Sequence, residues 1–194
     1  AVALDCEMVG VGEKSISGIA RISAIDYLTG EILIDTLVQP TQLVKDWRTK
    51  YSGITEEAMT EAIAQGNILS GWPEARASLF KHIDANTVLV GQSLQHDLLA
   101  LGIQHKQIVD SAILTSAAVG RNAKRRWGLK DLCAQLLSIK IQNDDKAGHN
   151  SVDNAFAARE VVLWCLRNPD KLKQWGKKQR NEYYGKTTYK SKTG

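Results

Sequence analysis

The chain has 194 residues, a formal net charge of +4, and 43% hydrophobic and 24% charged residues, which suits one globular domain with a real core. No apolar run approaches the roughly 20 residues of a membrane-spanning helix, so no membrane partner is expected. The three cysteines are widely spaced and form neither a metal-ligand pattern nor a disulfide framework. They favour an intracellular, reducing compartment and leave nucleus, nucleolus and cytoplasm open.

The first nine residues predict a strand, AVALDCEMV, with two carboxylates in its apolar middle. Strand side chains alternate between faces, so Asp5 and Glu7 point the same way. Two like charges on one face repel each other, and burying either of them is costly. A cation, a basic partner or solvent must therefore compensate for this pair.

The following segments predict an antiparallel meander and then helices. Residues 19–38 predict a hairpin with a turn at 27–31, and Pro40 ends it. Helices are predicted to start at Thr55, which caps its helix, and at Trp72. The remaining predicted helices span 97–101, 111–119, 129–137 and 151–166, and short strands are predicted at 87–90 and 107–109. This order indicates an α/β fold, a mixed sheet flanked by helices.

The composition changes near residue 169. We therefore divide the chain into a domain of residues 1–168 and a basic C-terminal extension of residues 169–194. One interpretation is a solvated, partly disordered tail. The other is a surface for single-stranded nucleic acid, because tyrosines alternate with the lysines.

Two later segments also combine polar residues with apolar structure. In GQSLQHDLLAL, Asp97 opens a predicted helix, where a carboxylate complements the positive end of the helix. In GHNSVDNAFAA, His149 precedes the longest predicted helix, and Asp153 and Asn154 lie on its first turn. Each segment alone is also compatible with an ordinary helix start.

Together, ALDCEM, GQSLQHDLLAL and GHNSVDNAFAA resemble, in this order, the DEDDh branch of the DEDD 3′→5′ exonuclease superfamily. The chain most resembles the small RNA exonucleases of that branch. DWRTKYSGIT and WGLKDLCAQLLSIKIQ are similar to intervening segments of these enzymes, so the resemblance covers residues 1 to about 167. It implies an RNase H-like fold, with an antiparallel meander plus parallel strands in one sheet.

The resemblance also implies a catalytic set. Its members are Asp5, Glu7, Asp97, His149 and Asn154. Asp5, Glu7, Asp97 and Asn154 would hold two Mg²⁺ or Mn²⁺ ions, which would compensate for the paired carboxylates. His149 would act as the general base. The implied reaction is metal-dependent 3′→5′ hydrolysis of single-stranded RNA from its 3′ end, with DNA left open, and the products are nucleoside 5′-monophosphates.

One position departs from the family pattern, because Asn154 stands where the last aspartate is expected. Three interpretations remain open. The site has lost activity but keeps fold and substrate binding, or Asp153 substitutes, or a slow enzyme tolerates the amide. The alternative functions are a catalytically inactive nucleic-acid-binding or scaffold protein on the same fold, and a two-metal nuclease that cuts internally.

Several residues are candidates for substrate contact. The segment GRNAKRRWGLK is the densest basic run of the predicted domain. The resemblance places the GIT segment near the 3′-terminal base. Cys6 and Met8 flank Glu7, although Cys6 faces the opposite side of the strand and is more typical of core filler. The full set of candidates is Cys6, Met8, Arg48, Ile54, Thr55, Arg121, Lys124, Arg125 and Arg126.

Overall fold

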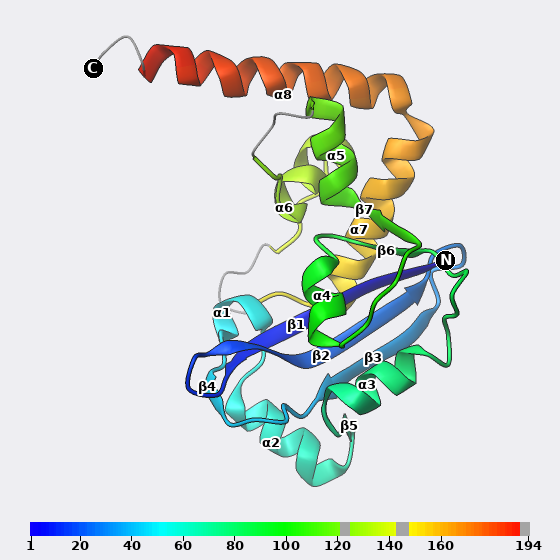
Figure 1. Cartoon of the computed structure of the whole chain (residues 1–194), viewed down its shortest axis with the longest axis vertical. Helices are drawn as coiled ribbons and strands as arrows, with labels where there is room; N and C mark the ends of the chain where they lie inside the picture. Colours follow the sequence, from blue (N-terminus) through cyan, green and yellow to red (C-terminus); the bar gives the residue numbers. More distant parts are fainter. Residues whose placement is uncertain (121–124, 143–147, 191–194) are drawn as a thin grey trace.

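A seven-stranded mixed sheet lies at the centre of the computed structural model, which describes residues 1–120, 125–142 and 148–190 (Figure 1). The order of its strands is β5-β3-β2-β1-β6-β7, and β4 pairs with β1. The strands are β1 (Val2–Val11), β2 (Ile16–Asp26), β3 (Ile32–Val38), β4 (Val44–Asp46), β5 (Ile68–Leu69), β6 (Leu89–Gly91) and β7 (Ile108–Asp110). Arg121 and Lys124, two of the candidate substrate residues, lie outside the described residues.

The predicted mixed sheet is confirmed. β1 pairs antiparallel with β2, and β2 pairs antiparallel with β3, whereas β6 runs parallel to β1 and to β7. The turn between β2 and β3 is fixed by Asp26, whose carboxylate accepts the backbone N–H groups of Leu28 and Thr29 at 2.9 and 2.7 Å. Gly30 closes this turn at a φ of +78°, which glycine adopts without strain.

The helices follow the predicted starts closely. They are α1 (Thr49–Ser52), α2 (Glu56–Gln65), α3 (Gly71–Leu79), α4 (Gln95–Ala100), α5 (Ser111–Val119), α6 (Leu129–Leu132), the π-helical turn η1 (Cys133–Leu137), α7 (Ser151–Arg167) and α8 (Pro169–Lys190). Thr55 caps α2 as predicted, because its side chain accepts the backbone N–H of Ala58. β4, β5 and α1 were not predicted, because two to four residues are too few to show a period. α8 was not predicted either, because its many charged residues favoured the interpretation of a solvated, partly disordered tail.

The sheet is covered on both faces. On one face, Leu4 and Cys6 of β1 pack with Leu79 of α3 and Leu98 of α4. On the other face, Ala3 packs with residues of α7, which include Ala155 and Val162. Since neighbouring residues of a strand face opposite sides, Asp5 and Glu7 share the α7 face with Ala3.

A second core lies between α5, α6, η1, α7 and the first part of α8 (Figure 1). Trp127 is its largest buried side chain, and its indole N–H donates to the Gln179 side-chain oxygen of α8 at 3.0 Å. Trp175 contacts the same indole edge to face. The boundary between residues 168 and 169 stays a prediction. None of the helices in the described part of the chain has the length and apolar content of a membrane span.

Candidate active site

Asp97 reaches β1 although it lies 91 residues after Cys6 in the sequence. α4 follows β6, which is parallel to β1, and Leu94 and Leu98 anchor this segment in the core. Asp97 is itself buried, and its Oδ1 accepts the backbone N–H of Cys6 at 2.8 Å. This bond places the Asp97 carboxylate beside the strand that carries Asp5 and Glu7.

Asn154 reaches Asp5 from α7. The side chain of Asn150 caps the first turn of this helix, and Ala155 fixes the turn against the sheet. Asn154 is buried, and its Nδ2 donates to Asp5 Oδ2 at 3.3 Å. Asp153 is exposed. Consecutive helical residues point about 100° apart, so Asn154 rather than Asp153 contacts Asp5.

The other end of the Asn154 amide is also occupied. Gln142 lies after η1, and its Nε2 donates to Asn154 Oδ1 at 2.9 Å. The carbonyl oxygen of Asn154, which is the only atom of this side chain that binds cations, therefore faces Gln142 and not Asp5.

The carboxylates disfavour ionisation in the metal-free protein. Burial, and then the charges of Asp97 and Glu7, raise the pKa of Asp5 well above its usual value, while the hydrogen bond from Asn154 opposes this shift. Burial raises the pKa of Asp97 to about 7, although the backbone N–H of Cys6 opposes the shift.

Glu7 has the clearest need for a partner. Its Oε1 is buried and has no hydrogen-bond partner among the described residues. Burial raises the pKa of Glu7 to about 8, although the positive charge of Arg21 on the paired position of β2 opposes the shift. Arg21 also forms a two-pronged ion pair with Asp35, at 2.9 Å for both N–H···O contacts.

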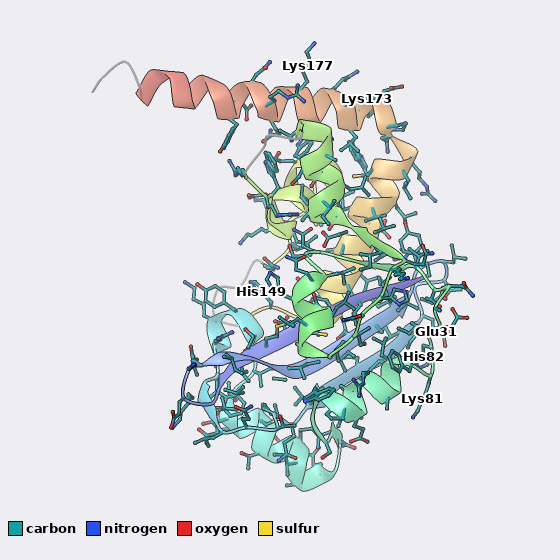
Figure 2. All side chains as sticks on the ribbon, viewed as in Figure 1. Glu31, Lys81, His82, His149, Lys173 and Lys177 are labelled. Atoms are coloured by element: carbon teal, nitrogen blue, oxygen red, sulfur yellow. The ribbon has the colours of Figure 1, made fainter. Side chains whose placement is uncertain are left out.

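His149 lies beside α1 (Figure 2), where its backbone N–H donates to the Tyr51 carbonyl at 2.9 Å. The Tyr51 ring meets the imidazole edge to face. Gly148, at a φ of +71°, lets the two segments approach so closely that an added Cβ would lie 2.3 Å from Gly53 Cα. Burial, and then the charge of Lys130, lower the pKa of His149, so the imidazole is neutral at pH 7.

The donor set suits a hard divalent cation. Asp5, Glu7 and Asp97 offer carboxylate oxygens, and the unpartnered Glu7 Oε1 is the kind of atom that such an ion satisfies. Among the described residues, however, no three His, Cys, Asp or Glu side chains are arranged as a complete metal site. The Asn154 amide takes one side of Asp5 through its hydrogen bond to Oδ2.

A cavity of about 690 Å³ lies beside Asn154. Its walls include Arg21, Gln142 and His149, whereas the three carboxylates do not line it. The structure thus brings Asp97 and Asn154 to β1 and places His149 in a cavity that Asn154 shares. Arg21 and Gln142 were missed in the sequence. Arg21 had a signal, because it is a charged residue within an apolar strand, whereas Gln142 had none.

The candidate substrate residues are more scattered. Ile54 is buried, and Thr55 caps α2. Cys6 is buried as well, and its backbone N–H donates to the Asp97 carboxylate. Met8 lines a second cavity on the opposite side of the sheet, with Trp72 and Leu99.

The arginines differ in how far they are engaged. Arg48 donates to Ser17 and to the Ser15 carbonyl, so its guanidinium is engaged in the β1–β2 hairpin. Arg125 is exposed but forms an ion pair with Asp131 at 3.7 Å and lies over the Trp127 ring, whereas Arg126 is exposed. Their roles in binding substrate stay predictions.

The sequence model of the RNase_T family, described as exonuclease, matches residues 2–162. The chain belongs to the RNase_T exonuclease family. Members of this family generally depend on divalent metal ions, and the predicted resemblance to the DEDDh exonuclease superfamily is confirmed.

Several relatives carry the name RNA exonuclease, and two of them illustrate the similarity. RNA exonuclease 3 of Candida albicans is 34% identical over 164 residues, which are 84% of this chain and 37% of that protein. Putative RNA exonuclease pqe-1 of Caenorhabditis elegans is 36% identical over 174 residues, which are 88% of this chain and 10% of that protein. The chain therefore spans well under half the length of either relative.

A solved structure confirms the predicted RNase H-like fold. It is the pseudoubiquitin hydrolase–RNA exonuclease module of Saccharomyces cerevisiae Pan2 in complex with AAGGAA RNA. The TM-score is 0.73 at 23% identity, and the match covers 98% of this chain and 32% of the Pan2 chain.

Proposed function

We propose that this chain is the nuclease domain of a metal-dependent 3′→5′ exoribonuclease that acts on single-stranded RNA, and that Asn154 impairs its activity. The products would be nucleoside 5′-monophosphates. The family and the names of the relatives support an exonuclease that acts on RNA. The observation that carries the proposal is the meeting of two distant segments at β1, through the Asp97–Cys6 and Asn154–Asp5 hydrogen bonds.

Each residue of the site has a role in the proposed reaction. Asp5, Glu7 and Asp97 would hold Mg²⁺ or Mn²⁺. Bound ions would supply positive charge at the scissile phosphate and lower the pKa of the attacking water. His149 is neutral at pH 7, so it is able to accept the proton of that water as a general base.

Asn154 weakens this arrangement twice. It contributes no negative charge, and it turns its N–H donors rather than its carbonyl oxygen toward Asp5. The second candidate function, a nucleic-acid-binding protein without activity, is favoured by this same contact, because the amide satisfies Asp5 without any cation.

The test compares the parent with Asn154→Asp on single-stranded RNA labelled at its 5′ end, in Mg²⁺ and in Mn²⁺. Asn154→Asp is expected to raise cleavage by about 10²–10³-fold, the usual effect of one group that stabilises the transition state. The matched control is Asn150→Asp, which makes the same charge change one turn earlier and keeps a capping side chain.

Shortening must begin at the free 3′ end, so RNA with a blocked 3′ end must stay intact. Equal cleavage of both RNAs would favour an enzyme that cuts internally. Binding of RNA by an Asn154→Asp protein that neither cleaves nor binds metal would favour the inactive binding protein.

A further inference from the structure

We infer that Gln142 is a positioning residue of this site, and that its side-chain amide decides which atom of residue 154 faces Asp5. The inference deepens the proposed function and rests on its metal dependence. It starts from a chain of two hydrogen bonds, from Gln142 Nε2 to Asn154 Oδ1 at 2.9 Å and from Asn154 Nδ2 to Asp5 Oδ2 at 3.3 Å.

Gln142 is held in place by its backbone. Its φ is +54°, in the left-handed region that residues other than glycine rarely adopt. Its backbone carbonyl oxygen accepts a hydrogen bond from the ammonium group of Lys130 in α6 at 3.0 Å. The preceding residue, Ile141, packs against the second core. These contacts hold Gln142 where its side-chain amide reaches Asn154, in the wall of the cavity that both residues line.

The chemistry of the two amides allows only matched orientations. An amide has one accepting end and one donating end, so two facing amides must present opposite ends to each other. If Asn154 alone turned its oxygen toward Asp5, its NH₂ group would meet the NH₂ group of Gln142. Asn154 therefore offers its oxygen to a cation beside Asp5 only if Gln142 turns as well.

An aspartate at position 154 escapes this constraint. Both of its oxygens are acceptors, so one takes the hydrogen bond from Gln142 while the other faces Asp5. Gln142 thus supports an aspartate as a metal ligand and holds an asparagine in the orientation that is not a ligand. The same donor has opposite consequences for the two residues.

Calorimetric titration with Mn²⁺ tests this reading without any measurement of RNA cleavage. In the Asn154→Asp protein, Gln142→Leu is expected to lower Mn²⁺ affinity about tenfold, as is typical when the partner of a metal ligand is lost. In the parent, Gln142→Leu is expected to leave the affinity unchanged or to raise it by up to about threefold, because the lost bond held Asn154 in the orientation that is not a ligand.

A second variant reverses the polarity of the contact. Gln142→Glu accepts a hydrogen bond from Asn154 Nδ2 and turns Oδ1 toward Asp5. In the parent, Gln142→Glu is expected to give an Mn²⁺ affinity about fivefold higher than Asn150→Asp gives. Asn150→Asp is the control, because it adds the same charge nearby and leaves the two amides unchanged. Thermal unfolding in EDTA identifies any variant that fails to fold.

Three results would overturn the inference. They are an equal loss of affinity for Gln142→Leu in both proteins, no gain for Gln142→Glu over Asn150→Asp, and no Mn²⁺ binding by the Asn154→Asp protein. If the Asn154→Asp protein binds Mn²⁺ and shows the expected dependence on Gln142 but leaves RNA intact, the proposed function fails and the positioning role stands.

Discussion

Replacing Asn154 with aspartate is expected to destabilise the metal-free protein. The variant removes the hydrogen bond from Asn154 Nδ2 to Asp5 Oδ2 and places a second carboxylate 3.3 Å away. A hydrogen bond to a charged group is worth about 1.5–3 kcal/mol. Two full charges at this distance would repel by about 5 kcal/mol at an effective dielectric constant of 20, so one carboxyl takes up a proton instead.

We therefore expect a loss of about 2–3 kcal/mol at pH 8, because a carboxyl that keeps its proton in the folded state and loses it in the unfolded state costs about 1.4 kcal/mol per unit of difference between its two pKa values. For a chain of this size the Tm falls by about 2–4 °C per kcal/mol, which predicts a decrease of roughly 4–12 °C in EDTA. Mn²⁺ at 100 times its Kd would return about 2.7 kcal/mol to the Asn154→Asp protein and less to the parent.

Thermal unfolding followed by circular dichroism, in EDTA and then in Mn²⁺, measures both effects. Lowering the pH to 5 should shrink the difference, because the pH is then closer to the ordinary pKa of an aspartate and keeping the extra proton costs less free energy. Asn150→Asp serves as the control and should change the Tm little. The reasoning fails if Asn154→Asp matches the parent in EDTA at pH 8, or if the control loses as much stability.

Three further outcomes are expected. In EDTA, the free energy of unfolding of the parent should fall as the pH rises from about 4 to 8. The reason is that Glu7 and Asp97 have pKa values of about 8 and about 7 in the folded state, against 4.5 and 3.8 when exposed. Unfolding in urea measures this free energy, and a rise across the same pH range would contradict the prediction. Arg21→Gln should shift the onset of Mn²⁺ binding to higher pH, since Arg21 lowers the pKa of Glu7; an unchanged calorimetric pH profile would argue against it. Gly148→Ala should lower the Tm more than Gly66→Ala, because both have positive φ but only Gly148 lacks room for a Cβ; equal losses would contradict this packing.

Local rules predicted the parts of the site that depend on a single element. The period of two in β1 was enough to place Asp5 and Glu7 on one face, and the cap signal at Thr55 set the start of α2. These two predictions needed only backbone geometry, and the structure bears out the placements. The choice of Asn154 over Asp153 came from the family resemblance, and helical spacing added only that the two side chains point about 100° apart.

Local rules did not predict the contacts between different elements. Asp97 lies 91 residues from its partner Cys6, and only the family resemblance connected them. Gln142 gave no signal, because a polar residue after a helix is ordinary until the fold places it against Asn154. Arg48 stands in a basic cluster of the sequence, but its guanidinium is used by the β1–β2 hairpin, a contact that depends on a left-handed backbone at Arg48 itself.

Residue 154 sets a balance between metal-free stability and metal affinity. Each carboxylate added to the buried cluster makes the empty site costlier, because burial already raises the pKa values of Asp5, Glu7 and Asp97. The same carboxylate strengthens the attraction for a divalent ion. Asn154 moves the site toward metal-free stability, since its amide satisfies Asp5 and is itself satisfied by Gln142. Metal affinity and metal-free stability should therefore change in opposite directions when residue 154 is exchanged, and a substitution that raises both would mean that the amide does not occupy the place of the ion.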